Sequence, residues 1–199
     1  MKKKYNLAAL VSLLIFILML ALVKLSYIGY FDNKVYSLFH INDFNTMFMT
    51  IITFFGEPET IFYITILILL FLENKKEKML IIINTILGLN IYYLLKIIIK
   101  RPRPIGINLV DATGYSFPSG HTFMTFVFYG FIIYLINLDN SKYLYKSVLN
   151  ILLILLIILM PISRIYLGVH FASDTIAGFS LAITYLFVFI NVIKKQKLL

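Results

Sequence analysis

The chain has 199 residues, of which 61% are hydrophobic, and its mean hydropathy is +0.92. Because an ordinary soluble domain is about 45–50% apolar, this composition excludes such a domain and favours a single polytopic membrane domain over residues 1–199. The formal net charge of +9 lies in short basic clusters between apolar runs, a pattern typical of membrane topology and phosphate binding rather than of a nucleic-acid interface.

The apolar runs predict an all-α polytopic membrane protein with six transmembrane helices, since one span needs about 20 apolar residues. In chain order the predicted spans are 6–28, 50–72, 79–99, 122–138, 147–162 and 175–193.

Two of these spans have alternative interpretations. The basic start and long apolar run at the N-terminus resemble a signal peptide, but no small-residue cleavage site clearly follows. We therefore interpret this segment as a retained first span. Residues 56–59, with the sequence GEPE, interrupt the second span, so that 44–55 is alternatively a separate short or re-entrant helix.

The distribution of positive charge orients the six spans, because cytoplasmic loops carry an excess of lysine and arginine. We predict a multi-pass protein of the cell membrane with both termini in the cytoplasm. Most of the 18 basic residues then lie inside, namely Lys2, Lys3, Lys4, Lys75, Lys76, Lys78, Lys142, Lys146, Lys194, Lys195 and Lys197. The others gather mainly at 96–103 and 164, on the disfavoured outer side, where an anionic ligand would explain them.

Three polar clusters interrupt the apolar pattern, at Lys96–Pro104, Pro118–His121 and Ser163–Asp174. In the six-span topology all three lie on the outer side, at the ends of spans 3 to 6. Each cluster alone has an ordinary explanation: a topology anchor, a helix cap or a chance pair of His and Asp. Their arrangement on one side favours a single site. His40 matches none of them, and we interpret it as structural or interfacial.

The first and third clusters supply Lys96, Arg103 and Arg164, side chains that donate hydrogen bonds and match phosphate oxygens. In the second cluster, Ser119 is a candidate helix cap, and Gly120 allows the backbone to approach a ligand. Free backbone N–H groups at a helix start favour an anion. His121 would then lie in the first helical turn.

His170 and Asp174 are four residues apart, so they would share one face if the segment is helical. A carboxylate bonded to one imidazole nitrogen selects the tautomer of the ring and stabilises positive charge on it. A nucleophilic histidine needs both effects.

Taken in order, these clusters resemble the three-part signature of the type 2 phosphatidic acid phosphatase family, and the likeness is to its small bacterial members. The signature corresponds to Lys-x6-Arg-Pro at 96–104, Pro-Ser-Gly-His at 118–121 and Ser-Arg-x5-His-x3-Asp at 163–174. All signature positions are filled, and the six-span layout extends the likeness over essentially the whole chain.

The resemblance implies a role for each residue. Lys96, Arg103, Arg164, Ser119 and Gly120 would bind the phosphate. His170 would attack phosphorus and form a phosphohistidine, Asp174 would orient His170, and His121 would protonate the leaving oxygen.

Family members act without a metal ion or other cofactor, so the resemblance implies none here. The implied partners are the bilayer and a lipid phosphate or diphosphate: phosphatidylglycerol phosphate, undecaprenyl diphosphate or phosphatidic acid. We also expect Lys100, Arg101, Asp111 and Tyr115 to influence headgroup choice. The alternative function is a lipid-phosphate binder or transporter on the same scaffold, without catalysis. A haloperoxidase is disfavoured, because that chemistry has no use for a hydrophobic body.

Overall fold

The chain is all-helical in the computed structural model, which describes residues 2–106, 108–138 and 143–198. Within them the helices are α1 (Lys2–Lys24), α2 (Gly29–Tyr36), α3 (Asp43–Phe54), α4 (Pro58–Phe71), α5 (Lys75–Ile99), α6 (Gly120–Ile136), α7 (Leu144–Tyr166) and α8 (Ala172–Lys195). The predicted all-α class is confirmed for this part of the chain. Lys142, which we placed on the inner side, lies outside the described residues.

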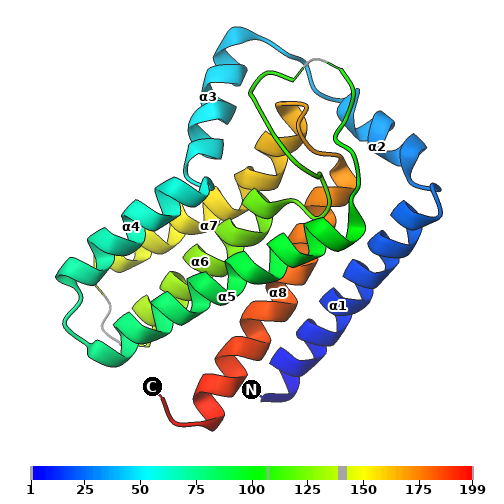
Figure 1. Cartoon of the computed structure of the whole chain (residues 1–199). Coiled ribbons are helices and arrows are strands. Elements are labelled where there is room, and N and C mark those ends of the chain that lie inside the picture. The colour runs from blue at the N-terminus through cyan, green and yellow to red at the C-terminus, as the bar shows by residue number, and fades with distance from the viewer. Residues whose placement is uncertain (1, 107, 139–142, 199) are drawn as a thin grey trace.

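The helices form a bundle around α6, which packs against α5, α7 and α8 (Figure 1). Helix α1 lies along the outer side of α8, and the short α2 also contacts α8. The main core is apolar and aromatic, with Phe123, Phe128 and Phe131 of α6 almost completely buried. Side-chain hydrogen bonds join helices inside this core. The amide of Asn84 in α5 donates to the Val127 carbonyl over 3.1 Å.

Local sequence explains where several helices begin. Asn42 caps α3 by accepting from the Asn45 N–H, and Asn74 caps α5 by accepting from the Lys76 N–H. Pro58 is the first residue of α4, where its missing N–H costs no hydrogen bond.

The predicted second span is divided into α3 and α4, with a bend of 53° between the two helices. This agrees with the alternative that 44–55 is a helix of its own. Gly56 lies at the corner, where an added Cβ would be 2.7 Å from Met160 Cε of α7. The absence of a side chain therefore lets the corner pack closely on α7.

Four described helices are long and apolar enough to cross a membrane: α1, α5, α7 and α8. The bent pair α3–α4 would make a fifth. Helix α6 has 17 residues, or about 25 Å at 1.5 Å per residue, against a hydrocarbon thickness of about 30 Å. The sixth span therefore stays a prediction. Helix α2 was not predicted.

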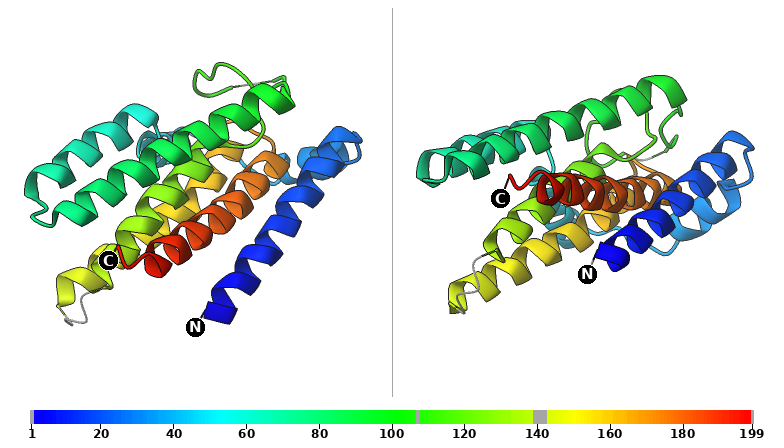
Figure 2. Two further views of the ribbon diagram at one scale, coloured as in Figure 1. Left: turned by 60° about the horizontal axis from the view of Figure 1, so that its bottom comes forward. Right: turned by 90° about the horizontal axis from the view of Figure 1, so that it is seen from below.

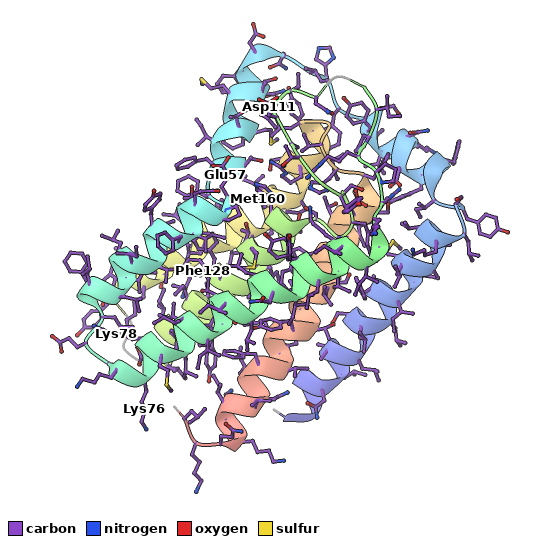
Figure 3. The ribbon with its side chains drawn as sticks, viewed as in Figure 1. Glu57, Lys76, Lys78, Asp111, Phe128 and Met160 are labelled. Atoms are coloured by element: carbon purple, nitrogen blue, oxygen red, sulfur yellow. The ribbon has the colours of Figure 1, made fainter. Side chains whose placement is uncertain are left out.

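The two termini lie at the same end of the bundle, and the segments 100–106, 108–119 and 167–171 lie at the other end (Figures 1 and 2). Figure 3 shows Lys76 and Lys78 at the start of α5, whereas Asp111 lies in the loop at the opposite end. The three polar clusters found in the sequence are all near this second end.

Candidate active site

The three predicted phosphate-binding cations come together from different elements. Lys96 is in the last turn of α5, Arg103 is in the loop that follows, and Arg164 is in the last turn of α7. Lys96 Nζ donates to the Tyr115 carbonyl over 2.7 Å. This bond directs the ammonium group toward the loop that leads into α6.

Arg103 joins the two loops at this end. Its Nη2 donates to the Thr113 carbonyl over 2.7 Å, and its Nη1 donates to the Val169 carbonyl over 2.8 Å. The same Nη1 lies 3.2 Å from His170 Nε2. The guanidinium is thus held between the loop before α6 and the loop before α8.

Arg164 is buried, with 3% of its surface exposed. Its Nη1 donates to Thr53 Oγ1 over 3.2 Å, but its Nε has no hydrogen-bond partner among the described residues. In that part of the chain, no carboxylate forms an ion pair with Lys96, Arg103 or Arg164. Because a buried charge is costly unless it is paired, the cluster has the electrostatic character of a site for an anion.

His170 and Asp174 are neighbours, although not on one helical face. Helix α8 begins at Ala172, so His170 lies in the preceding loop, and the helical arrangement considered from the sequence is wrong. Asp174 is instead the third residue of α8, where its Oδ2 accepts from the Phe171 N–H over 3.0 Å. The same Oδ2 lies 3.5 Å from His170 Nδ1.

The partners of His170 select its tautomer. Arginine has no acceptor atom, so the Nε2 that faces Arg103 must be the unprotonated nitrogen. The proton of the neutral ring is then on Nδ1, toward Asp174. Burial, together with Arg164, Lys96 and Arg103, holds the pKa of His170 well below its usual value. At neutral pH the imidazole is therefore uncharged, with the lone pair of Nε2 directed into the cation cluster.

The turn into α6 is built as predicted, with one difference. Ser119 is the N-cap, and its Oγ accepts from the Thr122 N–H. Its own N–H donates to the Asp174 carbonyl over 3.0 Å, so this N–H is not free for a ligand. The N–H groups of Gly120 and His121 lie in the first turn, where no helical carbonyl is available to them.

Two cavities open on the site. The larger, about 440 Å³, is lined by Lys96, Arg103, Gly120 and His121, together with aromatic and loop residues. The smaller, about 320 Å³, is lined by Arg103 and His170 among others. Arg103 lines both cavities, so it stands between the side that His121 faces and the side that His170 faces.

Sequence reasoning missed the surroundings of Asp174. We expected Arg101 to act on a headgroup, but its guanidinium is bonded to two carboxylates, Asp32 and Asp174. The position of Arg101 in the basic cluster at 96–104 marked it as a residue near the site, but we interpreted it as a contact for the lipid headgroup. Asp32 is in the unpredicted helix α2, and no pattern in the sequence marks it.

A family model described as the PAP2 superfamily matches residues 77–198. The chain therefore belongs to this superfamily, and the resemblance inferred from its motifs is confirmed.

Two curated relatives have related names. Phosphatidylglycerophosphatase B of Bacillus subtilis (strain 168) is 37% identical over 91 residues, which are 45% of this chain and 44% of that protein. The chain thus spans less than half of that relative's length in the match. An undecaprenyl-diphosphatase of Sulfolobus acidocaldarius is 28% identical over 185 residues, covering 86% of this chain and 84% of the relative.

Two crystal structures share the fold. The transmembrane PAP2-type phosphatidylglycerolphosphate phosphatase of Bacillus subtilis superposes with a TM-score of 0.80 at 26% identity, over 94% of this chain and 96% of that one. LpxE of Aquifex aeolicus gives a TM-score of 0.59 at 25% identity, over 76% and 88%. The protein thus has the fold of a membrane PAP2 phosphatase.

Proposed function

We propose that this protein is an integral-membrane lipid phosphatase that removes the terminal phosphate of a lipid phosphate or diphosphate through a phosphohistidine. The observation that carries the proposal is the cluster of Lys96, Arg103 and Arg164 beside the unprotonated Nε2 of His170. Three fixed cations that form no ion pair with a carboxylate among the described residues suit a phosphate, and a lone pair among them suits attack on phosphorus.

In the first step Nε2 of His170 attacks phosphorus, and the bond from phosphorus to the leaving oxygen breaks. Arg103 Nη1, which faces Nε2 in the free protein, transfers its hydrogen bond to a phosphate oxygen. The negative charge of the bound phosphate favours the protonated form of His121, which donates its proton to the leaving oxygen of the lipid. Asp174, whose Oδ2 lies 3.5 Å from Nδ1, stabilises the positive charge that develops on the ring.

In the second step water attacks the phosphohistidine, and the bond between phosphorus and Nε2 breaks. His121, now unprotonated, takes a proton from this water. Inorganic phosphate leaves, and both histidines return to their starting states. No step requires a metal ion, because Lys96, Arg103 and Arg164 neutralise the phosphoryl charge.

We further propose six crossings, with both termini in the cytoplasm and the site at the outer face. The position of the termini opposite the site supports an even number of crossings (Figure 1). Lys76 and Lys78, at the end where the termini lie, agree with the positive-inside rule (Figure 3). A headgroup could then reach the cations while its tails stay in the bilayer.

The names of the relatives favour phosphatidylglycerol phosphate and undecaprenyl diphosphate as substrates. A direct test is phosphate release by the purified protein from these two lipids and from phosphatidic acid. We expect release from at least one of them. Binding of all three without release would instead support a binder or transporter.

His170→Ala should abolish phosphate release, and His121→Ala should slow both steps, because His121 acts in each. With labelled substrate, rapid denaturation of the unmodified protein should trap an alkali-stable, acid-labile protein phosphate that is absent from His170→Ala. His40→Ala is the matched control, because His40 is exposed and should leave turnover unchanged. Turnover retained by a folded His170→Ala variant would refute the mechanism.

A further inference from the structure

Asp32 is an aspartate of α2 with only 2% of its surface exposed. Its Oδ1 accepts from the Ser173 N–H over 2.9 Å, and its Oδ2 accepts from Ser173 Oγ over 2.8 Å. Arg101 Nη2 donates to the same Oδ2 over 2.8 Å. Burial of a carboxylate is costly unless such partners are supplied, so these three hydrogen bonds offset the cost of burying Asp32.

Arg101 connects Asp32 to the site. Its Nη1 donates to Asp174 Oδ1 over 2.6 Å and to Ser173 Oγ over 2.7 Å. The guanidinium also lies 4.1 Å above the ring of Phe171, whose backbone N–H donates to the other oxygen of Asp174. Both carboxylate oxygens of Asp174 are therefore fixed, and Oδ2 is directed toward His170.

We propose that Asp32 and Arg101 are positioning residues for the phosphoryl transfer, acting on His170 through Asp174. This proposal rests on the proposed function. Arg101 clamps Oδ1 of Asp174, and Asp32 holds Arg101 in the orientation that makes the clamp possible. A planar guanidinium suits this task, because its two nitrogens reach two carboxylates at fixed angles.

The charges support the same role. A single guanidinium between two carboxylates leaves the group Asp32–Arg101–Asp174 with a net charge of about −1 by the ordinary ionisation states. Without Asp32, Arg101 would neutralise Asp174 alone, and the carboxylate would stabilise positive charge on His170 less well. Asp32 and His170 also line the same cavity of about 320 Å³.

The titratable groups around His170 come from every neighbouring element. They are Lys96 of α5, Arg101 and Arg103 of the following loop, His121 of α6, Arg164 of α7, Asp174 of α8 and Asp32 of α2. Asp32 and Asp174 are the acidic members of this set, so removal of either negative charge disfavours the protonated ring.

The test uses Asp32→Asn, which keeps the size of the side chain and an acceptor for Ser173. Asp43→Asn is the matched control, since Asp43 is an exposed aspartate at the start of α3. Asp32→Asn should lower kcat about tenfold or more, with KM for the lipid within about twofold. Arg101→Gln should also lower kcat, because Asp174 loses the bond to Oδ1.

The two variants should shift the pKa of His170 in opposite directions. Asp32→Asn removes a negative charge and should lower this pKa by about 0.5 to 1 unit, whereas Arg101→Gln removes a positive charge and should raise it. Nitrogen-15 NMR of histidine-labelled protein in detergent reads the pKa and the tautomer directly. The chain has three histidines, so His40→Gln and His121→Gln assign the signals.

Partial unfolding of the two variants could lower kcat in both. It could not shift the pKa of His170 down in one variant and up in the other. Loss of kcat in proportion to the folded fraction, with an unchanged His170 titration, would overturn the proposal. So would an Asp32→Asn variant that matches Asp43→Asn in both readouts. If the unmodified protein releases phosphate from no lipid, the proposed function fails. The NMR titration then still decides whether Asp32 and Arg101 control His170.

Discussion

The contact between α8 and the turn before α6 can be tested at Gly178. An added Cβ at this position would lie 2.7 Å from the backbone oxygen of Ser119. The same turn is bonded to α8 through the Ser119 N–H and the Asp174 carbonyl. Gly178→Ala should therefore push the turn that carries Gly120 and His121 away from α8.

The expected displacement follows from the distances. Ordinary contacts of a Cβ begin near 3.4 Å, so the oxygen or the helix must move by about 0.7 Å. A misplacement of about 1 Å costs roughly 100-fold in rate at a catalytic site, so kcat should fall about 10- to 100-fold. Overpacking of this kind should also cost about 1–3 kcal/mol of stability, partly offset by the higher helix propensity of alanine.

Gly130→Ala is the matched control. An added Cβ there would lie 2.8 Å from Leu186 Cδ2, the end of a side chain that can rotate away. Both variants gain the same helix propensity, so the comparison isolates the backbone clash. The assay is phosphate release at saturating lipid, with thermal unfolding in detergent measured in parallel. If kcat of Gly178→Ala is within about twofold of that of Gly130→Ala, the reasoning fails.

Other outcomes follow from the charges of the site. Because the pKa of His170 is lowered, the acid limb of the kcat/KM profile should lie below about pH 6.5, the usual histidine value; a limb above it would contradict a neutral His170. Phosphate release should persist in EDTA, whereas strict dependence on magnesium would exclude the proposed mechanism. Vanadate should compete with the lipid for Lys96, Arg103 and Arg164, and a lack of inhibition at millimolar concentration would argue against an anion site. A reporter fused to the C-terminus should be found in the cytoplasm; an external reporter would refute the proposed topology.

Much of the site could be predicted from the sequence because it depends on local chemistry. The spacing from Lys96 to Arg103 and the order of the three clusters are properties of the chain itself. The start of α6 is equally local, since a serine cap acts on an N–H three residues away. Hydropathy likewise placed the cores of the long helices, because apolar length is a property of each segment.

Tertiary structure alone decided how these parts are used. Asp32 and Ser173 are 141 residues apart, and no local pattern reports that packing of α2 on α8 brings them together. Arg101, which we expected to influence headgroup choice, instead bonds Asp32 and Asp174 because of this packing. In the folded protein the Ser119 N–H donates to the Asp174 carbonyl, so it is not available to a ligand. The sequence by itself therefore determined which groups are candidates for binding and transferring phosphate. The fold decided which of them face the site and which hold the others in place, since such pairings depend on where distant helices meet.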